Sequence, residues 1–398
     1  MIFFPICVRA IAKKHRTIYI HMAKIAVVIP KYGLIGGAEQ FVAELTEKLA
    51  VKTGHDFFVC ANRWQALSSA VIFHKIPIFS FPKFLTTPSF AYFTRRYLAT
   101  DVYDLIHTHD RIFSADIFTL HGIPHRYWVR NVRQKKMSLY DITTAWMEKK
   151  MVLDSGCRKF IAVSELTKGI FLDEYPAVQE KVSVIHPGVN LSDYTISDRE
   201  AVRVKIREAY GIGPNEPLLA FASMNFEIKG LDFIINALGK LKSRKYSFRL
   251  LVAGKGNTSK YTRLAQQAGV AENIIFTGKL DKRDLIRHYL ASDIYIMLSA
   301  FDTFGMVVLE AMAAGLPVII SSNVGAKDLV RENENGFVIA DTSNTEIIAD
   351  KIERLLDKNT HWRMSRAASA TASQNTWDHV VEKYVQIYRE VLQNKQRD

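Results

Sequence analysis

Three segments of the sequence combine residue types that can bind a phosphate or a polyhydroxylated group. The most informative is Ala300–Ile320, AFDTFGMVVLEAMAAGLPVII. Asp302 precedes a predicted helix, and Glu310 lies inside that helix about two turns further on. The first amides of a helix lack intrahelical partners and carry partial positive charge, and here they belong to Gly305, Met306 and Val307. An anion on these amides, with one carboxylate at either end to accept hydroxyl hydrogen bonds, matches the layout of a nucleotide sugar.

The two carboxylates also have a structural interpretation, in which Asp302 caps the helix and Glu310 is an exposed helical residue. The sequence around Glu310 is mostly apolar, and an isolated buried carboxylate needs a partner. We therefore favour a ligand-binding role for both carboxylates.

The other two segments are Lys31–Gln40 (KYGLIGGAEQ) and Ser223–Asp232 (SMNFEIKGLD), and each lies between a predicted strand and a predicted helix. Gly36 and Gly37 permit close backbone approach to a phosphate at a helix start, although an ordinary tight turn remains the alternative. The segment has neither the GxGxxG spacing nor the lysine of a P-loop. Lys229 can reach a phosphate as a point charge, and a cation is disfavoured at a helix start unless it has such a role.

Short apolar runs alternate with helical patterns along the chain. Strands are predicted at 24–29, 55–61, 104–107 and 160–163, and again at 217–223, 248–253, 274–277, 294–298 and 317–321. Helices are predicted at 38–52, 231–241, 261–267 and 377–392. This alternation is typical of parallel sheets covered on both faces, and the stretch 186–214 resembles a junction. We predict an α/β protein of two doubly wound, Rossmann-like domains, at 22–192 and 193–376, facing each other across a cleft.

Residues 1–21 carry four basic residues and no acid, and they do not follow the order of a secretory signal. They are predicted to be an unstructured leader, or the result of a start placed before Met22, with a membrane-touching arm as the alternative.

The net charge of +13 is concentrated in the first half of the 398-residue chain. Residues 1–190 hold 25 Lys and Arg against 15 Asp and Glu, which points to a polyanionic partner. The composition is 48% hydrophobic and excludes a disordered or fibrous chain. The three cysteines are widely spaced and support neither a disulfide framework nor a CxxC metal site.

Residues 117–140 contain no acid, and within them 125–136 (HRYWVRNVRQKK) holds five basic residues with a Tyr and a Trp. We predict contact with an anionic lipid surface or glycolipid acceptor, and a solvated loop is the alternative. The residues concerned are Arg126, Trp128, Arg130, Arg133, Lys135 and Lys136. The segment 79–98, rich in Phe, Tyr and Arg, is predicted to be a second acceptor-side loop, or else part of the core.

The three segments together resemble the retaining glycosyltransferases of the group 1 or family 4 type, which have two Rossmann-like domains (the GT-B fold). Within that family the wording of the segments is most similar to the lipopolysaccharide core glucosyltransferases. The resemblance covers 24–388 and implies that the C-terminal helix, 377–398, crosses back to the N-terminal domain. It also implies transfer of a hexose, with glucose expected, from a UDP-sugar to a glycolipid such as the inner-core heptose.

The resemblance assigns roles residue by residue. Lys229 neutralises the diphosphate, Asp302 contacts the transferred sugar where the family usually has Glu, and His121 in TLHGIP lies beside that sugar. Glu310 holds the ribose. The remaining donor-site positions are Gly36 and Gly37 near the β-phosphate, Gly254 in a glycine turn and Leu280 near the nucleobase.

Two positions depart from the family pattern. Asp302 is one methylene shorter than Glu, and Met224 and Ile228 stand where an arginine often accompanies the lysine. The family needs no metal or other cofactor where protein cations and amides stabilise the leaving group, and the sequence offers no convincing metal site; the cluster His107–Asp110 follows a strand.

Three alternatives stay open at this point: a hexosyltransferase for capsule or O-antigen glycan, a nucleotide-sugar epimerase, and a nucleic-acid-binding protein. The favoured interpretation places the enzyme in the cytoplasm, as a monomer on the inner face of the cytoplasmic membrane, with no nucleic-acid partner.

Overall fold

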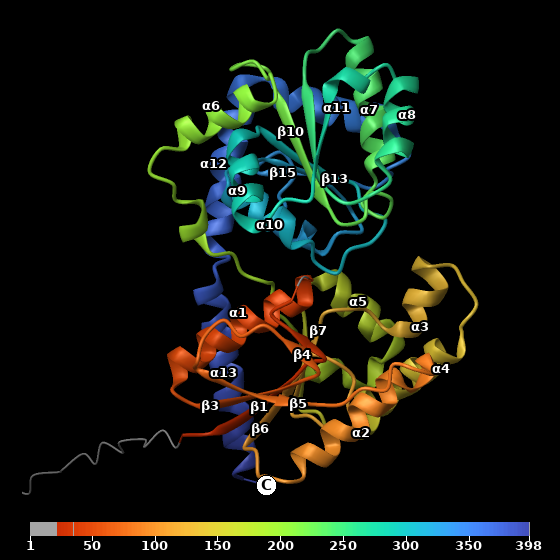
Figure 1. Ribbon diagram of the computed structural model, residues 1–398, viewed down its shortest axis with the longest axis vertical. Helices are drawn as coiled ribbons and strands as arrows, with labels where there is room; N and C mark the ends of the chain where they lie inside the picture. The colour runs from red at the N-terminus through yellow and green to blue at the C-terminus, as the bar shows by residue number, and fades with distance from the viewer. Residues whose placement is uncertain (1–21, 35, 398) are drawn as a thin grey trace, which may run out of the picture.

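The computed structural model describes residues 22–34 and 36–397, so the predicted leader lies outside the described residues. The chain forms two α/β units, one above the other in Figure 1, each built on a parallel sheet. The prediction of a two-domain, doubly wound α/β fold is confirmed.

The first sheet has seven parallel strands in the order β5-β3-β1-β6-β7-β8-β9. They are β1 Lys24–Val28, β3 Asp56–Ala61, β5 Val71–Lys75, β6 Leu105–Thr108, β7 Ile117–Leu120, β8 Lys159–Ala162 and β9 Val182–Val184. A small parallel pair, β2 Lys31–Tyr32 and β4 Arg63–Trp64, lies beyond the carboxyl ends of β1 and β3. The central strand β1 is buried from its second residue on, as its continuous apolar run predicts.

The second sheet has six parallel strands in the order β12-β11-β10-β13-β14-β15. They are β10 Leu218–Ser223, β11 Arg249–Gly254, β12 Ile274–Gly278, β13 Ile294–Met297, β14 Val318–Ser321 and β15 Gly336–Ile339. Every strand predicted from the sequence is present, within two residues at either end.

Helices cover the faces of both sheets (Figure 1). In the first unit they are α1 Gly37–Thr53, α2 Thr86–Leu98, α3 His125–Tyr127, α4 Leu139–Asp154 and α5 Glu165–Glu174. In the second they are α6 Arg199–Ala209, α7 Leu231–Ser243, α8 Thr258–Gln267, α9 Lys282–Ala291, α10 Met306–Ala313, α11 Thr345–Leu356 and α12 Lys358–Gln374. All the predicted helices are present, including the one that contains Glu310.

The predicted loop at 79–98 is wrong for most of its length, because 86–98 forms helix α2. Phe90 and Ala91 are buried and Thr94 follows one turn later on the same face, which is a helical spacing. The alternative, that aromatic residues here pack in the core, holds for Phe90, while Phe79, Phe81 and Tyr92 are exposed.

The last helix, α13 Trp377–Lys395, returns to the first unit, where it lies beside α1 in Figure 1. Its Trp377, Tyr384 and Tyr388 are buried in the core around β1. The Tyr388 hydroxyl lies 2.7 Å from Nδ1 of His107 on β6. The helix therefore ties the end of the chain to the N-terminal domain.

The two units touch through polar and apolar contacts. The Ser164 hydroxyl donates to the Thr303 carbonyl at 2.6 Å, and the Glu165 amide donates to Asp328 at 2.7 Å. A Cβ on Gly325 would lie 2.7 Å from the Cβ of Ser164 in the other unit, so glycine permits this close approach of the two units. The contacts bring the carboxyl ends of both sheets towards each other. No helix among residues 22–34 and 36–397 is long and apolar enough to span a membrane.

Candidate active site between the domains

A cavity of about 490 Å³ lies between the two units and receives side chains from both. The N-terminal unit supplies Arg111, His121, Gly122, Ile123, His125 and Trp128. The C-terminal unit supplies Ser223, Met224, Asn225, Ile228, Lys229, Phe301, Asp302 and Thr303. Ligands of doubly wound folds bind at the carboxyl ends of the strands, and both sets of residues follow such ends.

Lys229 and Asp302 form an ion pair in this cavity, with side chains 19% and 20% exposed. Gly230 adopts φ +72°, and a Cβ there would lie 2.1 Å from the Leu298 carbonyl oxygen, so the glycine sets the start of α7 against the end of β13. The amide of Phe304 donates to Oδ1 of Asp302 at 3.2 Å. The sequence assigned these two residues to neighbouring parts of one ligand, and the structure brings them together.

Helix α10 starts directly behind Asp302. Gly305 precedes it with φ +85°, a left-handed conformation that favours glycine, and the amides of Met306 and Val307 stand in its first turn. Met306 and Val307 are partly buried against the core of the C-terminal domain, and Leu280 packs on the same core. Gly305, Met306, Val307 and Leu280 do not line the 490 Å³ cavity.

Glu310 occupies a partly buried position further along α10. Burial raises the pKa of Glu310, while the nearby Lys282 ammonium lowers it and Asp193 raises it. Lys282 forms an ion pair with Asp193 at 2.8 Å, so a cation, two carboxylates and the half-buried Tyr194 gather around this end of the helix. The carboxylate thus has a polar environment on an otherwise apolar helix.

His121 enters the cavity from the N-terminal side. Its Nε2 lies 2.9 Å from Nδ1 of His109, and its ring meets Phe41 edge-on at 4.8 Å. Burial lowers the pKa of His121 to about 3, so the imidazole is neutral near pH 7. Behind it, both ring nitrogens of His107 are engaged, by Tyr388 at 2.7 Å and Thr119 at 2.8 Å.

The predicted glycines Gly36 and Gly254 shape the backbone near the cavities. Gly36 stands at the start of α1, close to a second cavity of about 380 Å³ that Lys31, Ala38 and Glu39 help to line. Gly254 has φ +122°, and a Cβ there would lie 1.7 Å from the Ser223 carbonyl oxygen. Gly254 thereby lets the end of β11 approach Ser223 at the wall of the 490 Å³ cavity.

The basic segment divides into two parts. Trp128 opens a π-helical turn, Trp128–Val132, and its ring lies 6.1 Å from that of Phe301, so it forms part of the cavity wall and the interdomain contact. Nε of Arg126 lies 3.8 Å from Oε1 of Glu174, so the two side chains form an ion pair. Arg130, Arg133, Lys135 and Lys136 are exposed, and none of the four pairs with an acid in the described part of the chain.

Sequence reasoning missed the charged residue Arg111, which lines the cavity, and Glu148, which binds its guanidinium. Arg111 lies three residues after β6, at the same sheet edge as the predicted residues, so its position in the pattern was a usable signal. Glu148 lies in α4 and only the fold brings it to Arg111. No group of three or more potential metal ligands gathers in the described residues.

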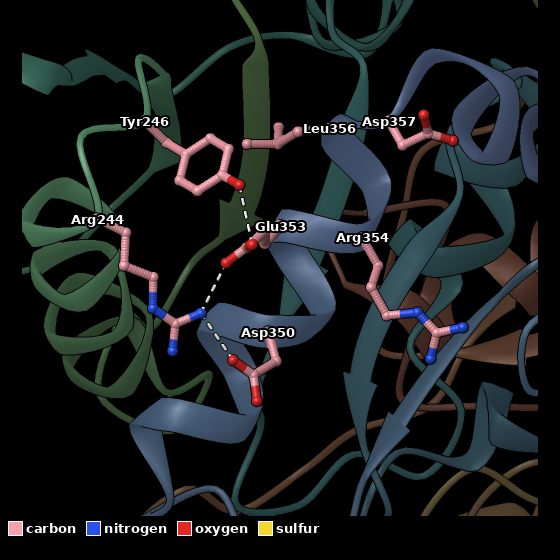
Figure 2. A pocket seen from close by; sticks show the side chains of 7 residues that line it. All are labelled: Arg244, Tyr246, Asp350, Glu353, Arg354, Leu356 and Asp357. Atoms are coloured by element: carbon pink, nitrogen blue, oxygen red, sulfur yellow. Dashed lines mark hydrogen bonds and ion pairs between the residues drawn. The ribbon is translucent and has the colours of Figure 1, made fainter.

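A hollow of about 550 Å³ on the C-terminal domain is built differently (Figure 2). Arg244, at the end of α7, meets Asp350 and Glu353 of α11 at 2.7 Å each, and the Tyr246 hydroxyl donates to Glu353 at 2.8 Å. The charges and hydrogen bonds of these groups are thus satisfied within a single domain.

Each of the two units matches a separate family of known proteins. Residues 202–373 match the family described as "Glycosyl transferases group 1", and residues 35–193 match "Glycosyltransferase Family 4". An uncharacterized glycosyltransferase of Methanocaldococcus jannaschii is 26% identical over 386 residues, covering 92% of this chain and 98% of that protein. The chain therefore has the GT-B fold of the group 1 and family 4 glycosyltransferases, and glycosyltransferase activity is supported.

Two solved structures are similar in fold. WaaG, a glycosyltransferase involved in lipopolysaccharide biosynthesis, superposes with a TM-score of 0.74 at 22% identity, covering 92% of this chain and 99% of WaaG. The Anabaena protein Alr3699/HepE, solved with UDP and glucose, superposes with a TM-score of 0.71 at 18% identity, covering 92% and 99%.

Proposed function

We propose that this chain, a glycosyltransferase of GT-B fold, transfers a hexose, expected to be glucose, from a UDP-sugar to a glycolipid with retention of anomeric configuration. The observation that carries the proposal is the interdomain cavity, in which Lys229 and Asp302 from one domain face His121 from the other. Its volume of about 490 Å³ suits a sugar with part of a diphosphate. The Anabaena protein solved with UDP and glucose has the same fold and supports the choice of donor.

The leaving group dictates the chemistry that these residues must supply. Departure of UDP develops negative charge on the β-phosphate, and fixed donors aimed at that charge lower the barrier. In the proposal Lys229 leaves Asp302 to pair with the diphosphate, and the first amides of α10 add partial positive charge. Protein donors then perform this role without a metal ion.

Asp302, once released from Lys229, accepts hydrogen bonds from the hydroxyls of the transferred sugar. His121 is neutral, so it can donate to or accept from a sugar hydroxyl without adding charge next to the diphosphate. Retention follows from front-face attack, in which the departing phosphate takes the proton of the acceptor hydroxyl. Glu310 accepts from the ribose hydroxyls, and Leu280 packs near the base.

The acceptor is proposed to be the inner-core heptose of lipopolysaccharide, reached at the inner face of the cytoplasmic membrane by a monomeric enzyme. WaaG, whose fold is similar, acts in lipopolysaccharide biosynthesis, which supports this choice. The exposed Arg130, Arg133, Lys135 and Lys136 supply positive charge for an anionic membrane surface, where each is worth about 1 kcal/mol. Replacing all four with Gln should release the protein from vesicles containing anionic lipid, measured by sedimentation, and undiminished sedimentation would remove this role.

The reaction is tested with a panel of UDP- and GDP-sugars, scored for nucleotide release with and without truncated lipopolysaccharide. We expect release of UDP from UDP-glucose only when acceptor is present, with the new glycosidic bond in the α configuration. Conversion of the nucleotide sugar without acceptor would indicate an epimerase, and release with a capsule or O-antigen precursor alone would redirect the acceptor.

A further inference from the structure

Arg111 lines three cavities, one of them a small hollow of about 220 Å³ that Glu148 also lines. Arg111 lines the 490 Å³ cavity that contains Lys229 and Asp302. It also lines the 380 Å³ cavity in the N-terminal domain. Residues of α2 and α4, together with Lys31 and Glu39, form other parts of the wall of that cavity. His125 is shared by the same two cavities. A group bound at Arg111 therefore lies where a ligand from the donor side and a ligand from the acceptor side would meet.

Glu148 binds the guanidinium of Arg111 and fixes its position. Nε and Nη2 of Arg111 donate to Oε2 of Glu148 at 2.9 and 2.7 Å. Glu148 is itself buried, with its side chain 5% exposed, and accepts further bonds from the His125 amide at 3.0 Å and the Tyr175 hydroxyl at 3.1 Å. A carboxylate fixed by this many donors fixes the arginine plane as well.

Arg111 keeps donors available for a ligand. Its side chain is 22% exposed, and Nη1 forms an ion pair with Oδ1 of Asp110 at 3.6 Å, which is beyond hydrogen-bond distance. An arginine carries five N–H donors, and Glu148 engages two of them. The remaining donors lie on the part of the guanidinium that Glu148 does not cover.

The opposite wall of the cavity is short of positive charge. Met224 and Ile228, beside Lys229, are uncharged, and Lys229 is itself paired with Asp302. A second fixed cation would add to the stabilisation that Lys229 and the first amides of α10 give to the departing nucleoside diphosphate. Arg111 is the cation that the N-terminal domain brings to the same cavity.

We propose that Arg111 is a substrate-binding residue of the transfer reaction that donates to a phosphoryl oxygen, and that Glu148 is its positioning residue. The proposal rests on the proposed function. The phosphoryl group is either the β-phosphate of the donor or a phosphate carried by the acceptor, and Arg111 supplies a planar, two-pronged donor to either.

The test uses three variants of the full chain. Arg111→Lys keeps the charge and removes the fork, and Glu148→Gln keeps the shape and removes the charge behind the arginine. The double variant Arg111→Gln/Glu148→Gln avoids leaving a buried carboxylate unpaired. Arg244→Gln is the matched control, because Arg244 also pairs with carboxylates but outside the cleft. The melting temperature of each variant is recorded.

Calorimetric titration with UDP and with inorganic pyrophosphate is combined with steady-state transfer kinetics. If the donor supplies the phosphoryl group, Arg111→Lys raises the dissociation constant of UDP by about tenfold or more. If the acceptor supplies it, UDP binding is retained, pyrophosphate binding weakens and the acceptor KM rises by a similar factor. Glu148→Gln should change the same constant as Arg111→Lys, with the two effects non-additive.

The proposal is overturned if folded Arg111 variants bind UDP and pyrophosphate, and transfer sugar, within about threefold of the unmodified protein and of Arg244→Gln. It is also overturned for Glu148 if Glu148→Gln lowers only the melting temperature. Failure of the proposed function is a separate result: the unmodified protein would then bind pyrophosphate through Arg111 but show no preference for UDP.

Discussion

The two hollows of comparable size, one between the domains and one at α7 and α11, differ in the charge balance of their walls. In the hollow of Figure 2, Arg244 is matched by Asp350 and Glu353, both within a single domain and with substantial exposure to solvent. Outside the hollow, Glu346 pairs with the same guanidinium. In the interdomain cavity the charged groups come from two domains, lie partly buried and retain free hydrogen-bonding capacity.

The contrast shows that the volume of a hollow says little about function. The exposed ion pairs of the hollow in Figure 2 connect two helices. They contribute little to the stability of the fold, because water screens the charges. Partly buried charges that converge from separate elements cost desolvation, and a bound ligand can offset that cost. Substitutions in the two hollows should therefore differ greatly in their effect on sugar transfer.

Replacing Lys229 with Ala should lower kcat/KM for transfer by about 10²–10³-fold, because it removes a fixed donor aimed at the developing charge. The measurement is steady-state UDP release with saturating acceptor. The melting temperature serves as the control for folding. Transfer that survives undiminished would contradict the role of Lys229.

Replacing Glu310 with Ala should raise the donor KM by about 10–100-fold, since a carboxylate that accepts from hydroxyls contributes more than a neutral acceptor. The pKa of Glu310 is raised, chiefly by burial, so the carboxylate takes up a proton at a higher pH than an ordinary glutamate. We therefore expect the donor KM to rise as the pH falls towards that pKa, and Glu310→Gln to abolish this dependence. An unchanged KM would remove Glu310 from the site.

Replacing Trp128 with Ala should lower kcat/KM by about 3–10-fold, because the aromatic contact with Phe301 is worth about 1 kcal/mol. Phe301 immediately precedes Asp302, so loss of the contact loosens the loop that carries this carboxylate. A double-mutant cycle with Phe301→Ala measures the coupling. Strict additivity of the two effects would show that the ring contact does not matter for transfer.

Replacing Arg244 with Gln should leave kcat/KM within about twofold of the unmodified protein. The exposed ion pairs of Arg244 contribute little to stability and lie outside the cavity between the domains. The same kinetic assay checks this. A large loss of activity would make the hollow of Figure 2 a functional site and would invert the comparison.

Much of the fold follows from local patterns in the sequence. Continuous apolar runs such as Leu218–Ser223 predict buried parallel strands, and the helical spacing after Gly305 predicts α10 with Asp302 before it and Glu310 inside it. The strands β2, β4, β5, β7, β9 and β15 were not predicted, because their pairing depends on the sheet already formed.

The part of the site that was missed depends on docking between elements that are distant in the sequence. Arg111 and Glu148 are 37 residues apart, and the contact between Trp128 and Phe301 crosses from one domain to the other. No local pattern marks these pairs. Trp128 was predicted for its basic neighbours, and only the packed structure shows its ring in the cavity wall.

We expect a nucleoside diphosphate to bind in the interdomain cavity and not in the hollow of Figure 2. Equilibrium titration of UDP into the unmodified protein, Lys229→Ala and Arg244→Gln tests it most directly. We expect UDP to bind equally to the unmodified protein and to Arg244→Gln, and at least tenfold more weakly to Lys229→Ala. Equal binding by Lys229→Ala, or loss of binding in Arg244→Gln, would contradict it.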